Sequence, residues 1–208
     1  SELRNAFNDA AIREITDAFQ SMGSDPDIRV IVMGAHGKAF SAGGDLNWMR
    51  AMADYSWAEN HADATGLANM LWAIANCPVP VIARVQGDCY GGGVGLVAAC
   101  DIAVAVDTAH FSLSEVKLGL IPATISPYVI RAMGERAARR YFVTAERFGA
   151  AKAQDIGLLH EAVPADQLDD TVDALVKAIL SNGPAAVRAS QDLIGYVAQQ
   201  PVTPELRD

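Results

Sequence analysis

The chain has 208 residues, of which 51% are hydrophobic, and it carries a formal net charge of −9. That length can bury one sizeable core, and its apolar runs fall short of the roughly 20 residues that a membrane-spanning helix needs. The acidic balance argues against nucleic acid as a partner. We therefore expect a globular protein whose partners include neither a membrane nor a nucleic acid.

Cysteine and histidine usage argues against a metal centre. Cys77, Cys89 and Cys100 lie in apolar surroundings without CxxC spacing, and the four histidines are scattered. Buried, reduced thiols are typical of a reducing compartment, and no charged-then-apolar leader is visible. The expectations are no metal and a cytoplasmic location.

The first part of the chain alternates helices and strands. Hydrophobic spacing predicts helices at 8–22 and 60–76, the first capped by Asn8 or Asp9. Runs rich in valine and isoleucine predict buried strands; these are expected at 28–35, 77–87 and 101–106. Glycine-rich segments, in the loop 36–49 and at 91–95, each open a short helix.

The last third reads as helical. Short helices are expected across 125–157, ending at Gly157. Two amphipathic helices are expected at 166–181 and 184–198, the second beginning at Pro184, a residue that suits the first turn of a helix. Strands that alternate with helices imply a mostly parallel sheet, with ligands where strands end and helices begin.

Two glycine-rich junctions lie at such places: "SAGGD" at 41–45 and "GGGVG" at 91–95. Glycine at a helix entry leaves backbone N–H groups free to face a ligand. Neither junction matches a P-loop or a dinucleotide-binding fingerprint. Two interpretations stay open: the glycines allow tight packing of strand on helix, or they supply paired N–H donors to an oxygen that gains charge in a reaction.

A resemblance bears on that choice. "AFSAGGDLNWM", then "PVPVIARVQGDCYGGGVGLVAACDIAVAVDTAHFSLSEVKLGLIP", and later "GERAARRYFVTAERFGAAKAQDIGLLHEAVP" closely resemble the enoyl-CoA hydratase/isomerase (crotonase) family. The resemblance implies an α/β fold, a crotonase-type spiral of ββα units with a helical C-terminal region. It divides the chain into a spiral core with the acyl-CoA site, 1–140, and a helical trimerisation region, 141–208.

The family resemblance also implies a substrate and a site. The substrate is an acyl-coenzyme A thioester, so coenzyme A is part of the substrate and no separate cofactor is expected. The thioester oxygen is expected between the backbone N–H groups of Ala42 and Gly92. The further substrate-binding residues that it implies are Lys38, Ala39, Phe40, Gly43, Gly44, Asp45, Gly91 and Tyr128. Lys38 and Arg4 are candidates for contact with the CoA phosphates, or are simply solvated charges.

Hydratases of this family generally carry two glutamates. The second matches Glu115, whose apolar neighbours favour a raised pKa and proton transfer at carbon; without the family match it reads as a surface residue paired with Lys117. The first would fall at position 95, which is Gly95 here. Glycine can neither activate water nor carry a proton, so the chain departs from the two-glutamate pattern.

Three functions remain open. The first is an enoyl-CoA hydratase, most like bacterial methylglutaconyl-CoA-type hydratases of leucine breakdown, with water activated by Tyr128, Ser126 or Asp45. The second is a Δ3,Δ2-enoyl-CoA isomerase with Glu115 as the sole proton shuttle. The third is a CoA-binding protein without turnover. The resemblance further implies a homo-oligomer, a trimer or hexamer, assembled through the C-terminal helices.

Overall fold

The computed structural model describes residues 4–198, 200, 201, 203 and 206. Its strands form two four-stranded sheets, and the first six strands in chain order belong to one sheet and the other in turn. In chain order the strands are β1 (Ile31–Gly34), β2 (Ala39–Ser41), β3 (Val81–Val85), β4 (Asp88–Tyr90), β5 (Ile102–Val106), β6 (His110–Ser112), β7 (Phe148–Gly149) and β8 (Glu161–Val163). The first sheet has the order β1-β3-β5-β8 and the second β2-β4-β6-β7. From β1 to β6, successive strands therefore alternate between the sheets, as a spiral of ββα units requires, whereas β6 and β7 are neighbours in the second sheet.

The pairing in both sheets is mostly parallel, as predicted. Every neighbour in the first sheet is parallel, and in the second only β7 runs antiparallel, against β6. The middle strands of the first sheet are buried on both faces, which explains their continuous runs of valine, isoleucine and alanine.

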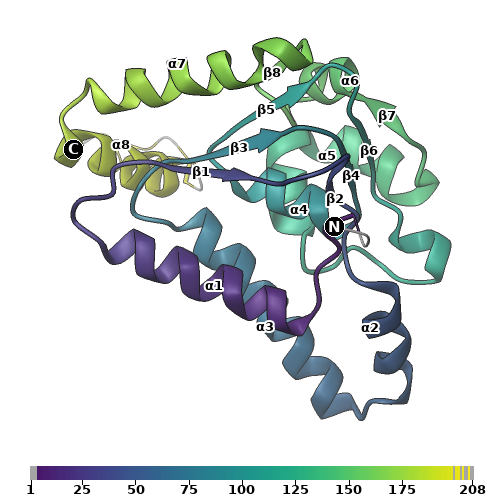
Figure 1. Cartoon of the computed structure of the whole chain (residues 1–208). Helices are drawn as coiled ribbons and strands as arrows, with labels where there is room; N and C mark the ends of the chain where they lie inside the picture. The colour runs from purple at the N-terminus through teal and green to yellow at the C-terminus, as the bar shows by residue number, and fades with distance from the viewer. Residues whose placement is uncertain (1–3, 199, 202, 204–205, 207–208) are drawn as a thin grey trace.

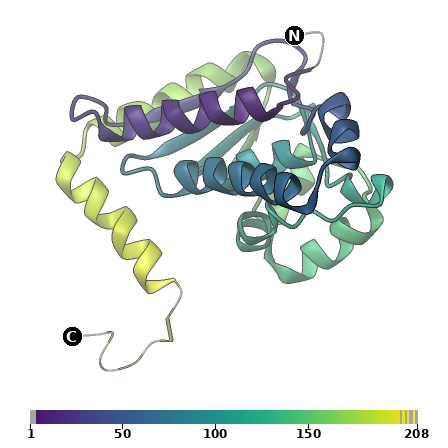
Figure 2. The same cartoon turned by 90° about the horizontal axis from the view of Figure 1, so that it is seen from below.

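Helices cover both faces of the first sheet. Figure 1 shows α7 on one side of this sheet and α1 and α3 on the other. The helices are α1 (Asp9–Ser24), α2 (Leu46–Ala51), α3 (Trp57–Ala75), α4 (Gly92–Ala99), α5 (Ser126–Thr144), α6 (Ala150–Asp155), α7 (Leu168–Leu180) and α8 (Pro184–Val197). Single turns of 3₁₀ helix lie at Met52–Asp54, Glu115–Leu118 and Ala165–Gln167. Helix α8 has no buried residue and extends away from the body (Figure 2).

Local chemistry explains where the main helices begin. The Asn8 side chain accepts a hydrogen bond from the Ala11 N–H at 3.0 Å, which makes Asn8 the N-cap that the sequence allowed. Ser56 and Glu59 form a reciprocal capping box at the start of α3. Pro184 opens α8 as expected.

The region 125–157 contains the expected succession of helices and one short strand besides. Residues 126–144, labelled α5, are two helical segments that meet at a kink at Gly134, where φ is 77° and ψ is 156°. The short strand β7 then follows before α6. Strands of two or three residues, such as β7 and β8, are too short to show a period of their own, so tertiary pairing alone reveals them.

Candidate active site

The segment at the start of the described chain runs beside the first glycine junction. The Phe7 N–H donates to the Gly43 carbonyl at 2.9 Å, and the Asp45 N–H donates to the Phe7 carbonyl at 2.9 Å. Nearer the N-terminal end of both segments, the Ala42 N–H donates to the Arg4 carbonyl at 3.0 Å. The Ala42 amide, expected to bind the substrate oxygen, thus already has an acceptor within the chain.

The two glycine junctions, distant in sequence, come into contact. A Cβ atom built on Gly43 would lie 2.7 Å from the Tyr90 carbonyl oxygen and 3.2 Å from the Gly92 nitrogen. The φ angle of Gly43 is also +83°, a conformation that disfavours side chains. Glycine at position 43 therefore permits this close approach of two backbones.

Two N–H groups at this contact are unpaired. Within the described residues, neither the Gly44 nor the Gly92 N–H donates a hydrogen bond. Gly92 is the first residue of α4, whose N-terminal amides have no partner inside the helix. Gly44 lies next to Gly43, which touches Gly92, so both of these N–H groups are available to an acceptor at the contact between the junctions, whereas the Ala42 N–H that the sequence suggested already donates to the Arg4 carbonyl.

The carboxylate of Glu115 lies against the second junction. A Cβ atom built on Gly91 would be 3.3 Å from Oε1 of Glu115 and 3.7 Å from its Cδ. Oε2 is buried and has no hydrogen-bond partner among the described residues. Burial raises the pKa of this carboxyl above its ordinary value, opposed only by its own backbone N–H. The structure contains no bridge between Glu115 and Lys117 within the described residues, so the surface-pair interpretation fails.

Beyond Gly91, one turn along α4, the space above Gly95 is filled. A Cβ atom there would overlap Cγ2 of Ile125 and lie 2.7 Å from its Cβ. Ile125 is 2% exposed and immediately precedes α5. The sequence stretch "ATISPY" contains nothing that marks Ile125 as a neighbour of the site, and sequence analysis missed it.

The groups offered as activators of water are engaged to different degrees. Asp45 caps α2, where its Oδ1 accepts from the N–H groups of Asn47 and Trp48 at 2.8 and 2.9 Å. The Ser126 hydroxyl donates to the Ala123 carbonyl at 2.7 Å. Tyr128 is half-buried in α5, and burial raises its pKa. Its hydroxyl makes no hydrogen bond to the described part of the chain.

The remaining expected binding residues divide by exposure. Lys38 and Arg4 are exposed, which suits contact with a charged ligand as well as plain solvation. The side chains of Ala39 and Phe40 are buried in β2 and belong to the core, 5% and 3% exposed. These two residues could meet a ligand only through their main chain.

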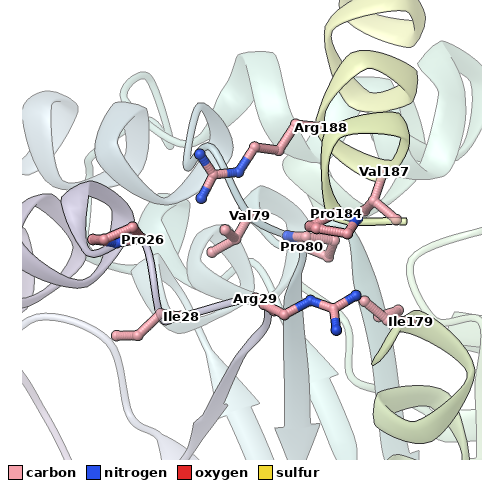
Figure 3. A pocket seen from close by; sticks show the side chains of 9 residues that line it. All are labelled: Pro26, Ile28, Arg29, Val79, Pro80, Ile179, Pro184, Val187 and Arg188. Atoms are coloured by element: carbon pink, nitrogen blue, oxygen red, sulfur yellow. The ribbon is translucent and has the colours of Figure 1, made fainter. Parts of the chain in front are cut away.

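A cavity of about 70 Å³ lies elsewhere, where α8 begins beside the starts of β1 and β3 (Figure 3). Arg188 enters it from α8 and Arg29 from the segment before β1, but no residue of the glycine junctions lines it.

The described residues contain no cluster of three or more His, Cys, Asp or Glu that could hold a metal ion. They also contain no helix long and apolar enough to cross a membrane.

Comparison with known proteins shows the family of the chain. A model of the enoyl-CoA hydratase/isomerase family matches residues 1–204. The chain is similar to a putative enoyl-CoA hydratase of Thermus thermophilus, 30% identical over 193 residues, covering 93% of this chain and 76% of the relative. It is also 33% identical to a Mycobacterium tuberculosis protein named as a hexahydro-indene-carboxyl-CoA hydrolase, over 98% of this chain and 81% of that relative.

Solved structures match more closely still. A putative enoyl-CoA hydratase/isomerase from Legionella pneumophila superposes with a TM-score of 0.94 at 46% identity, covering 99% of this chain and 80% of that one. An enoyl-CoA hydratase from Shewanella pealeana gives a TM-score of 0.96 at 42% identity, with coverage of 100% and 77%. The fold is thus the crotonase spiral, and the chain belongs to the enoyl-CoA hydratase/isomerase family of enzymes.

Proposed function

We propose that the chain is an enoyl-CoA hydratase that adds water across the 2,3 double bond of an acyl-CoA thioester. The observation that carries this is the Glu115 carboxyl lying against Gly91, next to the contact between Gly43 and Gly92. The names of relatives, several of which are enoyl-CoA hydratases, support the same reaction.

The proposed chemistry uses the two unpaired amides and one carboxyl. The thioester oxygen accepts from the N–H groups of Gly44 and Gly92. As the oxygen of water bonds to C3, the electron pair of the double bond moves to form an enolate, and these donors stabilise its negative charge more than that of the ground state. Protonated Glu115 gives its proton to C2. The attacking water loses one proton to solvent, and the Glu115 carboxylate takes a proton from solvent in turn, so that the net change is addition of H₂O and the acid is restored.

A second candidate, an enoyl-CoA isomerase, is favoured by the packing of Ile125 over Gly95, because no second carboxylate faces Glu115 from this turn of α4. In that reaction the Glu115 carboxylate removes a proton from C2 of a 3-enoyl-CoA. The resulting carboxylic acid returns the proton to C4, and the double bond moves from C3–C4 to C2–C3. One residue performs both transfers, and no water is consumed.

One absorbance assay separates these functions. Hydration removes the conjugated enoyl-thioester band from a 2-enoyl-CoA, whereas isomerisation creates this band from a 3-enoyl-CoA. If binding of CoA thioesters is measured by calorimetry but neither signal appears with a panel of acyl chains, the chain binds CoA without turnover. The panel begins with a methylglutaconyl-type thioester, the acyl class that the resemblance of residues 118–148 suggests.

Self-association belongs to the same proposal. Helix α8 exposes apolar side chains that a second chain would cover, with Leu193, Ile194 and Tyr196 each 60% exposed or more. We expect a homo-oligomer, a trimer or hexamer, and sedimentation equilibrium measures the number of chains in it directly.

The three free thiols fit a reducing, cytoplasmic location.

A further inference from the structure

The cavity at the start of α8 is lined by apolar side chains and two arginines. Residues from three places meet there: the segment before β1, the start of β3 and the turn from α7 into α8. Seven of its nine lining residues are proline, valine or isoleucine, and the other two are Arg29 and Arg188. No acidic residue of the described chain lines it, although the whole chain has a net charge of −9. Two positive charges therefore border an apolar space that contains no negative charge to balance them.

Arg29 is held beside the turn between α7 and α8. Its Nη2 donates to the Asn182 carbonyl at 2.6 Å. Its Nε is buried and has no hydrogen-bond partner among the described residues. A buried donor on a charged group is costly when it lacks an acceptor. We therefore expect this N–H to take its acceptor from outside the chain.

Arg188 brings a second charge that the described residues leave unpaired. It makes no hydrogen bond or ion pair with them. Asp25 and Asp27, in the loop between α1 and β1, form no ion pair with either arginine within the described structure. The Asp101 carboxylate accepts instead from the Gln191 side chain of α8, at 3.2 Å. The positive charge of Arg188 is thus available to a ligand.

The first turn of α8 adds to the positive potential. Pro184 and Val187 of this turn line the cavity, and Gly183 provides no side-chain cap for the helix. The N-terminal end of a helix favours negative charge. In Figure 3, Arg29 and Arg188 reach the cavity from different elements, and their guanidinium groups lie apart. One anion can therefore contact Arg29 directly while Arg188 attracts it over a longer distance.

The size and lining of the cavity indicate the chemistry of the ligand. Its volume is about 70 Å³. One water needs roughly 10–15 Å³ of such space, so about five to seven heavy atoms fit. Alkyl carbons suit the apolar lining, and a carboxylate suits the donors of a guanidinium group.

We propose that this cavity binds a short aliphatic carboxylate of about three to five carbons, with the carboxylate on Arg29 and the alkyl chain on the apolar lining. Arg188 increases the affinity through its charge. No residue of the glycine junctions lines this cavity, so the proposal is independent of the proposed function. Because the lining includes both α8 and the starts of β1 and β3, the ligand also strengthens the attachment of α8.

Sodium butyrate is the probe, titrated into ¹⁵N-labelled protein at constant ionic strength. The backbone N–H signals of Val79, Val187 and Arg188 should shift together and saturate. Butanol lacks the charge and inorganic phosphate lacks the alkyl chain, so each should bind about tenfold more weakly or worse. The Gly44 and Gly92 signals report separately on butyrate that enters the thioester site. Shifts confined to those two glycines, or equal binding of butanol or phosphate, would overturn the proposal.

Substitutions of the two arginines complete the test. Arg29→Met should weaken butyrate binding by about tenfold or more, and urea unfolding checks that it is folded without the bond to Asn182. Arg188→Met loses no hydrogen bond and should weaken binding by about threefold or more. Arg13→Met, an exposed arginine paired with Asp9 on α1, is the matched control and should bind as the parent does. Unchanged binding in Arg188→Met contradicts the role of the second charge, and unchanged binding in folded Arg29→Met overturns the site.

Discussion

Ile125 lies directly over Gly95, so closely that a Cβ atom at position 95 would overlap its side chain. The two residues come from α4 and from the loop that leads into α5, two elements in close contact. The departure from the two-glutamate pattern at position 95 is therefore part of the packing: the space beside Gly95 is filled by isoleucine.

Gly95→Ala should destabilise the protein by about 1–3 kcal/mol, because an extra methyl group in a filled core forces side chains or backbone to move. Urea unfolding measures this loss. Gly195→Ala, in α8, is the matched control, since a Cβ atom there meets nothing within 4 Å. In the double variant Gly95→Ala/Ile125→Ala, the loss in free energy of unfolding should be smaller than the sum of the losses in Gly95→Ala and Ile125→Ala. Strict additivity of these losses would contradict the overlap.

Glu115→Gln should reduce turnover by about 10²–10⁴-fold, the usual contribution of a positioned acid or base, while thioester binding changes little. The amide keeps the shape of the carboxyl but cannot carry the proton. Steady-state kinetics and calorimetric binding measure the two effects. Glu161→Gln, an exposed glutamate on β8, should retain full activity, and full activity in Glu115→Gln would remove the carboxyl from the mechanism.

The stability of the protein should depend on pH through Glu115 in a defined direction. Burial raises the pKa of this carboxyl in the folded state above that in the unfolded chain. Between these two pKa values the folded state binds more protons, so this group lowers the free energy of unfolding as the pH rises through that window.

Glu115→Gln removes that penalty. Relative to the parent, the variant should be more stable at pH 7 and should lose this advantage as the pH falls below the ordinary glutamate range. Comparing the two proteins cancels the contribution of Asp101, another buried carboxyl whose pKa burial raises. Urea unfolding at pH 7 and pH 4 checks the sign, and a variant that gains stability only at the lower pH would contradict it.

The amide that meets the substrate oxygen can be identified directly. In ¹⁵N-labelled protein, an unreactive acyl-CoA analogue should move the N–H signals of Gly44 and Gly92 to lower field, because each gains an acceptor. The Ala42 signal should move less, since its N–H already donates to the Arg4 carbonyl. The opposite pattern, with Ala42 shifted and Gly44 unchanged, would restore the pairing expected from the sequence.

Gly43→Ala should separate the two junctions. Its φ of +83° and the 2.7 Å distance from a built Cβ atom to the Tyr90 carbonyl leave no room for a methyl group. We expect a lower free energy of unfolding and a drop in kcat larger than that of the Gly195→Ala variant, in which the added methyl group meets nothing within 4 Å. Equal kinetic effects in the two variants would count against a role for the Gly43 contact.

The sequence by itself determined much of this protein. Periodicity located α1, α3, α7 and α8 and the three longer parallel strands, because these elements are long enough to show an apolar face. Glycines at two strand-to-helix junctions, together with the motif resemblance, indicated the site and Glu115 as its acid or base. These are properties of contiguous residues, and a chain read in order displays them.

Tertiary structure decided the rest. The short strands of the second sheet exist only through pairing between segments far apart in the chain. The Ala42 amide is occupied because residues 4–7 return beside 42–45, and no local pattern encodes that return. Likewise, Glu115 lies against Gly91 and Ile125 against Gly95, because neither glycine has a side chain and two other segments fill the space. Which groups lie beside a carboxylate depends on contacts between distant parts of the chain, and these are fixed only when the core closes.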